Sequence, residues 1–397
     1  MTAPGTILAL NAGSSSLKFA VFAECAALPD MMRGAVTQSA GAAHVLAHDA
    51  AGKCLIDQPL ADGGDAAALA TVLALADATG ALVAVGHRVV HGGADHAAPE
   101  RVDPALLAAL AGLIALDPLH LPHNLALIRA VQAARPHVLQ VACYDTAFHH
   151  TMPLVAQQMA LPRALRDAGM RRYGFHGLSC EFIAQALHEV APALAAGRTI
   201  IAHLGAGASL CALAHGRSLA STMGLSVLDG LVMATRCGSL DPGAIFMLGR
   251  MGHDLATIED LLYHRSGLLG LSGISGDMAV LLASPDPRAA EAIAHYVYRL
   301  ALDIGAMAAA LGGLDGIVFT GGVGAHAAAI RAAVGDRLGW LGLRLNPRAN
   351  AAGAALISAA DSRVAVRVIA TDEERVIARH ARAIYSENRA RTAPSSA

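Results

Sequence analysis

Residues 7–21 read ILALNAGSSSLKFAV, an apolar run that passes through small residues into a second apolar run. Residues 201–214 read IAHLGAGASLCALA and repeat this order. Short apolar runs bounded by glycine and serine are typical of buried strands joined by a tight turn. The two stretches therefore predict two lobes built on the same strand-loop-strand unit, each offering a backbone loop to a shared ligand.

The rest of the chain alternates short runs rich in Ile, Val and Leu with longer amphipathic stretches rich in Ala and Leu. This alternation predicts an α/β protein with mixed sheets and flanking helices. Outside the two repeats, strands are predicted at residues 83–90, 138–143, 316–320 and 364–369. Helices are predicted at residues 104–116, 125–134, 179–189, 287–311 and 372–385. The last helix is expected to return to the first lobe, and residues 387–397 are predicted to form a disordered tail.

The composition limits what the chain binds. A chain of 397 residues with 55% apolar content has room for more than one core. A net charge of -2 and a pI near 6.8 argue against nucleic acid or an anionic membrane as the main partner, which leaves a small molecule. The longest uncharged stretch contains glycine and histidine, so no membrane span is predicted. No leader peptide is apparent, and a cytoplasmic protein is expected. The six cysteines are scattered, which predicts reduced thiols rather than a zinc site or disulfides.

The first loop has the features of a phosphate-binding turn. Its small residues let the backbone approach a phosphate, the hydroxyls of Ser14 and Ser16 can donate to it, and Lys18 adds a positive charge. Lys18 and Lys53 are the only lysines in the chain, and Asn11 offers an oxygen ligand to magnesium or its waters. The alternative is an ordinary hairpin turn between two strands.

Two further glycine loops follow predicted strands. HLGAGAS at residues 203–209 repeats the first design, and FTGGVG at residues 319–324 is expected to open a helix near His326, with its amides directed at a ligand. Residues 322–327 also match the dinucleotide-binding fingerprint GxGxxA, but residues 341–346 lack the acid that this fingerprint requires. A dinucleotide-binding unit is therefore rejected.

Four segments combine Arg, His and Asp with glycine at the ends of apolar runs. They are GHRVVHGG (86–93), YDTAFH (144–149), RRYGFHG (171–177) and TRCG (235–238). Strand ends deliver side chains into clefts, and the planar fork of arginine binds two oxygens of a carboxylate or phosphoryl group. The alternative is that the histidines are structural and the arginines solvated.

In this order along the chain, these segments resemble the acetate kinase family and its propionate kinase relatives over nearly the whole length. The matching motifs run from Asn-x-Gly-Ser-Ser-Ser-x-Lys through HRVVHGG, RRYGFHG, HLG-x-GAS and FTGG-x-G to Thr-Asp-Glu-Glu at residues 371–374. The resemblance implies a two-lobed ribonuclease-H-like fold, shared with sugar kinases, actin and chaperone ATPases. Residues 1–147 plus 374–397 would form the acid and phosphate lobe, and residues 148–373 the nucleotide lobe with the interface of a homodimer. The substrates would be acetate and ATP, with Mg²⁺ as the metal and Mn²⁺ as its alternative.

The resemblance also implies roles for single residues, carried over only where the motifs match. It implies a carboxylate-binding Arg88, a catalytic Asp145, a phosphoryl-stabilising pair in His176 and Arg236, and metal-side residues Asn11 and Glu373. Two cations in line with the attack suit a phosphoryl transition state, which spreads charge over three oxygens. Acetate is already ionised at neutral pH, so Asp145 can equally orient the substrate or the metal shell instead of moving a proton.

The nucleotide and the methyl end of the acid have their own implied contacts. Implied nucleotide contacts are Ser14, Ser16, Lys18, His203, Leu204, Gly205, Ala206, Gly207, Asp277, Met278, Ala279, Gly322, Val323, Gly324, Ala325 and His326. Implied apolar contacts of the acid are Val90, Leu119, Phe175 and Val227. Three departures from the family pattern concern the nucleotide: Ala206 for Asn, Ala279 for Arg, and Ala325-His326 for Glu-Asn. These departures leave the phosphate donor open among ATP, GTP and pyrophosphate.

The expected reaction is reversible transfer of the γ-phosphoryl group of ATP to acetate, giving acetyl phosphate and ADP. A propionate or butyrate kinase is the first alternative, since one methylene in an apolar pocket is worth only about 1–3 kcal/mol. A nucleotide-regulated binding protein of the same fold is the second. The kinase prediction requires Arg88, His176 and Arg236 to converge where the terminal phosphate meets the acid.

Overall fold

The computed structural model describes residues 5–13, 16–39, 42–60 and 64–392, and the chain forms two compact units. Unit 1 consists of Met1–Ala147 and Asp372–Ala397, and unit 2 of Phe148–Thr371. The boundary near residue 371 differs by two residues from the sequence prediction, which placed Asp372 and Glu373 in the second lobe. Both belong to unit 1 because Asp372 caps the last helix and pairs with Arg33, a residue of the first sheet.

Unit 1 is built on one mixed sheet with the strand order β5-β4-β3-β2-β1-β6-β8-β7. Its strands are β1 (Thr6–Ala12), β2 (Ser16–Ala23), β3 (Asp30–Ser39), β4 (Ala42–Asp49), β5 (Cys54–Leu60), β6 (Leu82–Val89), β7 (Glu100–Arg101) and β8 (Leu139–Tyr144). Its helices are α1 (Asp65–Thr79), α2 (Pro104–Gly112), α3 (Leu121–Ala134) and α16 (Glu373–Thr392), with a short 3-10 helix at Ile114–Leu116. The strands β1 to β5 are antiparallel neighbours, whereas β1, β6 and β8 run parallel.

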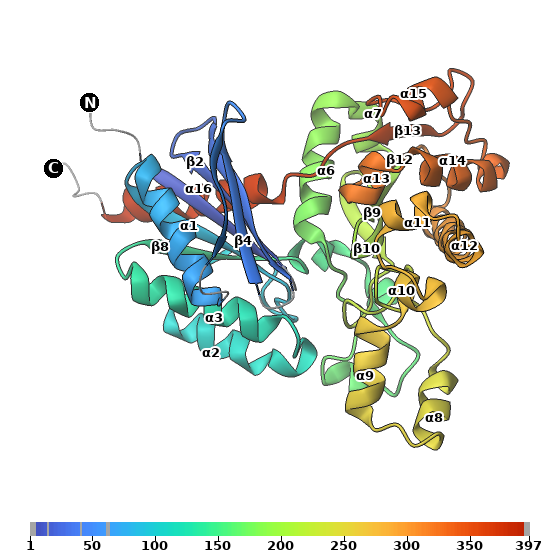
Figure 1. Cartoon of the computed structure of the whole chain (residues 1–397), viewed down its shortest axis with the longest axis horizontal. Helices are drawn as coiled ribbons and strands as arrows, with labels where there is room; N and C mark the ends of the chain where they lie inside the picture. Colours follow the sequence, from blue (N-terminus) through green and yellow to red (C-terminus); the bar gives the residue numbers. More distant parts are fainter. Residues whose placement is uncertain (1–4, 14–15, 40–41, 61–63, 393–397) are drawn as a thin grey trace. The chain divides into compact units, whose positions relative to one another are not determined.

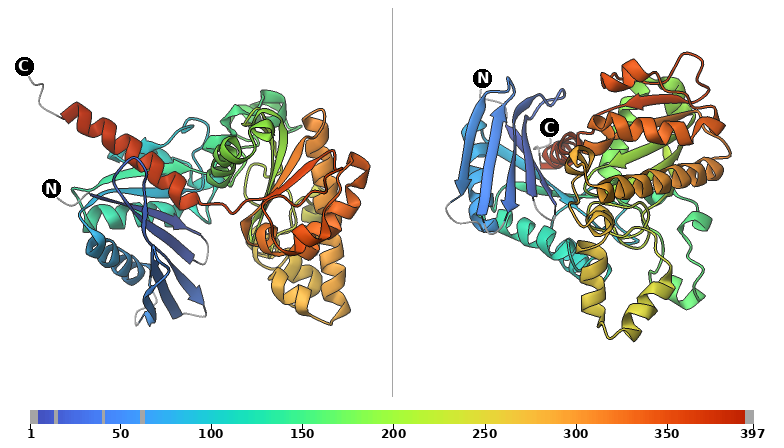
Figure 2. Two further views of the ribbon diagram at one scale, coloured as in Figure 1. Left: turned by 90° about the horizontal axis from the view of Figure 1, so that it is seen from above. Right: turned by 45° about the vertical axis from the view of Figure 1, so that its right-hand side comes forward.

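Helices cover both faces of this sheet (Figure 1). Alternate residues of the central strands, such as Leu8 and Leu10, form a core with α1 and α3. The opposite face carries α16, which contacts β1, β6 and β8 (Figure 2). Gly86 on β6 makes this close approach possible, because a Cβ there would lie 2.4 Å from Cγ2 of Ile377. The segment that returns from the end of the chain is thus an integral layer of unit 1.

Unit 2 is built on a smaller mixed sheet with the strand order β11-β10-β9-β12-β13. Its strands are β9 (Arg198–Leu204), β10 (Ala208–Ala214), β11 (Arg217–Ser221), β12 (Gly316–Thr320) and β13 (Ala365–Val368). Its helices are α4 (Leu154–Gln157), α5 (Arg163–Asp167), α6 (Gly177–Val190), α7 (Pro192–Ala196), α8 (Pro242–Arg250), α9 (Leu255–His264), α10 (Gly267–Ser272), α11 (Met278–Ala283), α12 (Pro287–Ala310), α13 (Gly321–His326), α14 (Ala328–Arg337) and α15 (Pro347–Ala351). Short 3-10 helices lie at Ala147–Thr151 and Gly339–Leu341.

The two sheets share the arrangement that the sequence repeat predicts. In unit 1 the antiparallel hairpin β1-β2 is followed by parallel β6 and β8, and in unit 2 the hairpin β9-β10 is followed by parallel β12 and β13. Helices α6 and α7 pack on one face of the second sheet through a core that includes Ile201 and Val318, and α12 lies on the other face (Figure 1). The predicted α/β class with mixed sheets and flanking helices is confirmed.

The third glycine loop follows β12 and opens a helix, as predicted: α13 starts at Gly321, whose φ of +75° turns the chain directly from the strand into the helix, and α14 begins at Ala328, two residues after His326. One local prediction is wrong. The tail is not disordered up to residue 392, because α16 continues to Thr392 through residues with high helix propensity, and Arg389 lies over the ring of Tyr385, one turn earlier. Residues 393–397 lie outside the described residues. In the described part of the chain, no helix combines the length and apolar character needed to cross a membrane.

Candidate active site

Two neighbouring parallel strands of unit 1 bring Arg88 and Asp145 together. Arg88 lies near the end of β6, opposite Cys143 of β8, and Asp145 follows the last residue of β8. The guanidinium donates from Nε and Nη2 to Oδ2 of Asp145, at 2.9 and 2.6 Å, and from Nη1 to the carbonyl oxygen of Ala12 at 2.9 Å. Burial disfavours the charged guanidinium, but Asp145 outweighs burial and raises the pKa of Arg88. Arg88 is therefore a permanent positive charge at the carboxyl end of the sheet.

Asn11 and the first turn of α16 form a second polar cluster in unit 1. Asn11 lies near the end of β1, the strand beside β6, and its Nδ2 donates to Oε2 of Glu373 and Oε1 of Glu374, both at 2.8 Å. Burial raises the pKa of Glu373, although Arg88 opposes this effect. Burial and then the charge of Glu373 raise the pKa of Glu374. Two half-buried carboxylates with raised pKa values mark a place where a cation would be stabilising.

The donor set of this cluster fits a magnesium ion. Within the described residues, no group of three or more His, Cys, Asp or Glu side chains is arranged to hold a metal ion by itself. Mg²⁺ does not require such a group, because it usually keeps several waters and binds through one or two carboxylates and the phosphates of a substrate. Oδ1 of Asp145 is buried without a hydrogen-bond partner among the described residues, and the charge of Asp145 acts on Glu373. Unsatisfied carboxylate oxygens of this kind are the ligands that Mg²⁺ prefers.

A network to which the sequence analysis gave no role holds the start of α16. Asp372 caps the helix by accepting from the backbone N–H of Arg375 at 3.0 Å. Arg33 donates to the two carboxylate oxygens of Asp372 at 3.0 and 2.6 Å, and both arginines lie over the ring of Phe22. Glu373 is the next residue after this cap, so the network fixes where its carboxylate lies. An Asp three residues before the bonded N–H is the local signal for such a cap.

His176 is held in unit 2 from two sides. Its Nδ1 is 2.9 Å from Oγ of Ser209 on β10, and its ring stacks on His203 with the centroids 4.3 Å apart. His203 in turn lies 2.8 Å, at Nδ1, from Oγ of Ser179. The backbone of His176 adopts φ = +57°, a left-handed conformation that is uncommon for a residue with a side chain and often marks a functional position. The sequence analysis included Ser209 in the second glycine loop but gave it no role.

Arg236 lies beside the same imidazole. A Cβ at Gly207 would be 3.1 Å from Nε2 of His176 and 3.7 Å from Nη1 of Arg236, so both groups border this glycine. Nη1 of Arg236 also lies 3.4 Å from the carbonyl oxygen of Val227. An imidazole and a guanidinium around a bare backbone suit the oxygens of a phosphoryl group. The structure therefore brings His176 and Arg236 together, while their predicted convergence with Arg88 stays a prediction.

The three segments predicted to bind the nucleotide in the second lobe border one cavity of unit 2. This cavity has a volume of about 530 Å³. Eight of the predicted residues line it: Gly205, Ala206, Asp277, Met278, Ala279, Gly322, Val323 and His326. Five others do not appear in its lining: His203, Leu204, Gly207, Gly324 and Ala325. Leu204 and Gly324 are buried, and the carbonyl oxygen of Ala325 accepts from Nη1 of Arg331 at 2.8 Å.

The predicted nucleotide contacts of the first loop belong to unit 1. Lys18 is exposed on β2, directly opposite Asn11 on β1. Ser16 lies at the start of β2, and Gly13 donates its backbone N–H to the carbonyl oxygen of Ser16 at 2.8 Å. Ser14 lies outside the described residues. Lys18 and Asn11 are thus near neighbours on the hairpin.

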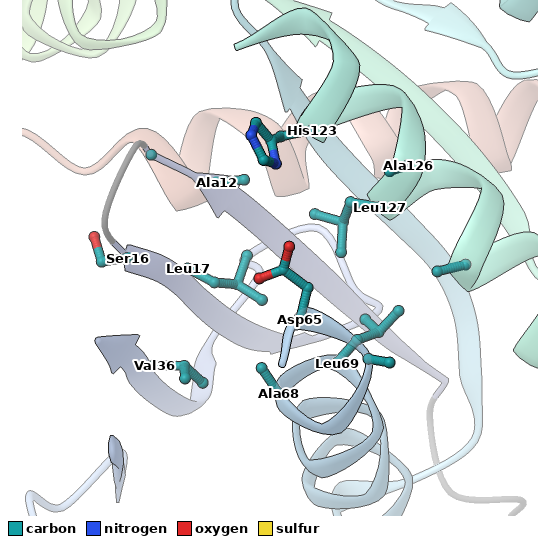
Figure 3. A pocket seen from close by; sticks show the side chains of 13 residues that line it. Ala12, Ser16, Leu17, Val36, Asp65, Ala68, Leu69, His123, Ala126 and Leu127 are labelled. Carbon is teal, nitrogen blue, oxygen red and sulfur yellow. The ribbon is translucent and has the colours of Figure 1, made fainter. Parts of the chain in front are cut away.

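Ser16 also borders a second cavity in unit 1, of about 320 Å³ (Figure 3). Figure 3 shows the carboxylate of Asp65 from α1 and the ring of His123 from α3 directed toward it, among apolar side chains such as Leu17 and Leu127. His123 is the only basic group among the described residues that line it. Such a lining does not suit a chain of phosphates.

The four apolar residues expected around the methyl end of the acid are divided between the units. Val90, 1% exposed, and the half-buried Leu119 lie in unit 1. Phe175 and Val227, 1% and 6% exposed, lie in unit 2. The backbone N–H of Val90 donates to Oδ1 of Asn124 at 3.0 Å, which fixes the chain directly after β6. Their role toward the acid stays a prediction.

An imidazole and a guanidinium at a glycine backbone, next to residues that line a cavity, suit one kind of reaction, because the transition state of phosphoryl transfer spreads negative charge over the transferred oxygens. The fold and the site thus define a phosphotransferase. The Acetokinase family matches residues 6–379, and the chain belongs to this family, whose members transfer a phosphoryl group to a carboxyl group.

Individual relatives match along almost the full length. An acetate kinase from Rhodopseudomonas palustris strain TIE-1 is 49% identical over 385 residues, which cover 94% of this chain and 97% of that protein. Among solved structures, a propionate kinase from Francisella tularensis has a TM-score of 0.87 and 33% identity and covers 95% of this chain and 98% of its own. An acetate kinase from Porphyromonas gingivalis has a TM-score of 0.84 and 33% identity, with 96% and 99% covered. The fold predicted from the sequence is therefore that of the acetate and propionate kinases.

Proposed function

We propose that the chain transfers the γ-phosphoryl group of ATP to the carboxylate of acetate, reversibly, and forms acetyl phosphate and ADP. The observation that carries the proposal is the meeting of His176 and Arg236 at Gly207, next to loop residues that line the cavity of unit 2. A nucleotide whose base occupies this cavity would direct its phosphates toward the loop. The relatives named acetate kinase at 49% identity support acetate as the acceptor.

On the donor side, the protein's contribution is to position and stabilise charge. Backbone groups at Gly205 and Ala206 would approach the phosphates closely, since neither residue carries a bulky side chain. His176 presents Nε2 toward Gly207 while Ser209 holds Nδ1, so the imidazole is fixed in orientation before the substrate binds. Arg236 adds a permanent charge at the same place. Together they would stabilise the transferring group more strongly in the transition state than in the ground state.

On the acceptor side, Arg88 would bind the acetate carboxylate. A guanidinium has five N–H donors, and the described contacts of Arg88 use three of them, one on each nitrogen. One N–H on each terminal nitrogen remains, and a carboxylate would accept from these two donors. Asp145 keeps these donors oriented through its two bonds to the guanidinium. Because acetate is already ionised, we assign Asp145 to orientation rather than to proton removal.

The reaction would use Mg²⁺, with Asn11 and Glu373 as the protein groups on the metal side. The metal supplies charge neutralisation for the phosphates of the nucleotide when it is bound. Glu373 binds a cation only when ionised, and its raised pKa makes that ionisation depend on the positive groups nearby. The sequence also offers Mn²⁺ as a substitute, since the same oxygen ligands suit both metals.

We further infer a homodimer in the cytoplasm. Helix α8 buries none of its residues, and Phe246 and Met247 on it are 65% and 55% exposed, as is Met251 at 63% directly after it. A second copy would cover this apolar surface, and light scattering of the purified chain tests the expected dimer mass. The cytoplasm is the compartment that supplies ATP.

Trapping the product tests the proposed reaction. Acetate, ATP and Mg²⁺ are incubated with hydroxylamine, which converts an acyl phosphate to a hydroxamate. We expect hydroxamate with the wild type, almost none with Arg236→Ala, and none after chelation of the metal. Arg265→Ala is the matched control in the same unit, since Arg265 is half exposed and forms an ion pair with Asp260 at 2.8 Å. ATP hydrolysis without any hydroxamate would contradict the proposal and favour a nucleotide-regulated binding protein.

The same assay separates the closest alternatives. Acids of two, three and four carbons are compared by kcat/KM, and a clear maximum at three or four carbons would reassign the acceptor to propionate or butyrate. ATP, GTP and pyrophosphate are compared as donors. We expect a nucleoside triphosphate to be preferred, because the cavity of unit 2 has an apolar lining that pyrophosphate would leave empty.

A further inference from the structure

Tyr296 stands out in the buried stripe of α12. This stripe faces the body of unit 2 and is otherwise made of apolar side chains, among them Ala289, Ala292, Leu300 and Ile304. The spacing of three or four residues is that of a core-facing helix surface, and such a surface alone would be filled equally well by phenylalanine. The tyrosine is 2% exposed, so its hydroxyl is a polar atom placed inside a core.

The hydroxyl of Tyr296 has no hydrogen-bond partner among the described residues. A buried hydroxyl without a partner is destabilising, and nearly all buried polar groups in folded proteins are paired. Burial also raises the pKa of Tyr296, so the phenol stays protonated and can act as a donor throughout the physiological pH range. A molecule bound against Tyr296 would supply such a partner.

Tyr296 also borders the cavity of unit 2. Among the described lining residues, the polar side chains are Asp277, Tyr296 and His326. The carboxylate of Asp277 already accepts from the backbone N–H groups of Ala279 and Val280 at the start of α11, at 2.7 and 3.4 Å. His326 is exposed. Tyr296 thus offers the buried hydrogen-bonding side chain of a wall that is otherwise mostly Ala, Gly, Leu, Met and Val.

We propose that the hydroxyl of Tyr296 hydrogen-bonds the purine base of the phosphate donor and makes Tyr296 a specificity-determining residue of this cavity. The inference rests on the proposed function, which places a nucleotide in unit 2. The base is the flat, least polar part of a nucleotide, so it matches an apolar wall, and its ring nitrogens accept a hydrogen bond from a phenol. A pyrimidine has a single ring and reaches less far into the cavity.

The test is Tyr296→Phe, with Tyr298→Phe as the matched control. Both changes remove one hydroxyl from α12, but Tyr298 is 47% exposed and does not line the cavity. Dissociation constants for ADP and CDP are measured by titration calorimetry, and Tm is measured without ligand. For Tyr296→Phe we expect the Kd for ADP to rise by about 3- to 10-fold, the effect of one hydrogen bond, with the Kd for CDP unchanged. The Tm of the free protein is expected to stay the same or rise, because an unpaired hydroxyl is removed.

A weaker affinity for ADP together with an unchanged or higher Tm supports the assignment. A merely structural tyrosine would not give this combination. An unchanged Kd for ADP, or an equal loss of ADP and CDP binding, would overturn it. The same is true of a fall in Tm, which would show that the hydroxyl is paired inside the free protein. If the wild type binds neither ADP nor ATP, the proposed function itself fails. If instead the wild type binds ADP and Tyr296→Phe binds it equally well, only the role of Tyr296 fails.

Discussion

Replacing Gly207 by alanine adds one methyl group between the imidazole of His176 and the guanidinium of Arg236. The new Cβ would lie 3.1 Å from Nε2 of His176, closer than nine in ten real Cβ contacts, and 3.7 Å from Nη1 of Arg236. The imidazole therefore has to move by a few tenths of an ångström, and the methyl group occupies space beside both side chains. No charge is removed and no positive φ is violated.

The expected result is a fall in kcat without a fall in stability. A misplacement of about 1 Å in a catalytic group costs about 100-fold in rate, so a smaller shift combined with the methyl group is expected to lower kcat by about 10- to 100-fold. Initial rates of hydroxamate formation at saturating acetate and ATP measure kcat, and thermal unfolding measures Tm. Gly339→Ala is the control, because a Cβ there meets nothing within 4 Å. If Gly207→Ala keeps kcat within about 3-fold of the wild type, His176 and Arg236 do not act at this glycine.

Three further substitutions test separate parts of the argument. Arg88→Ala removes the proposed carboxylate-binding group and is expected to raise KM for acetate by about 10- to 100-fold, because a hydrogen bond to a charged group contributes about 1.5–3 kcal/mol. An unchanged KM in initial-rate assays would exclude this role. Burial lowers the pKa of His87 to about 4, against the opposing bond from Gln140. The unfolded chain takes up this proton below about pH 6.5, so stability is lost as the pH falls from about 6.5 to about 4, by up to about 3 kcal/mol. His87→Leu is expected to lose less stability in urea unfolding over that range, and an identical pH dependence would refute the assignment. Arg331→Met removes the buried donor of two carbonyl oxygens of α13, those of Gly324 and Ala325. The free energy of unfolding is therefore expected to fall by about 3 kcal/mol. A loss below about 1 kcal/mol would show that water replaces the guanidinium.

The polar residues at strand ends were predictable because their signal is local. Asn11, Arg88 and Asp145 each stand where an apolar run ends, and residues that follow buried strands tend to reach the ligand edge of a sheet. Their actual pairing is not local. Arg88 meets Asp145 only because β6 and β8 are parallel neighbours with Arg88 opposite Cys143, a register formed by segments more than 50 residues apart. Sequence spacing carries no information on that register.

The segments that the sequence analysis left without a structure have weak patterns for a physical reason. Strand β5 is an edge strand, mostly exposed, so it lacks the apolar alternation that marks a half-buried strand. Helix α8 buries none of its residues, so its apolar side chains do not form a core-facing stripe. The disordered tail was predicted from composition alone. The contacts that oppose it, such as Arg101 with Asn388 at 3.3 Å, join distant parts of the chain.

Two of the departures in the nucleotide loops concern residues that line the cavity of unit 2 and carry no polar side chain. Ala206 and Ala279 stand where the family pattern has Asn and Arg, and both line the cavity of unit 2. Alanine at these positions offers no side-chain donor to a base, so the loops contribute shape and backbone groups. The hydrogen-bonding side chain that remains buried in the wall is Tyr296 on α12, a helix that no glycine motif marks. Recognition of the base in this chain would thus depend on a helix residue that looks like core in the sequence, because a single hydroxyl does not alter the apolar period of a helix. A preference for purine nucleotides would follow from that residue and not from the loops by which the family is recognised.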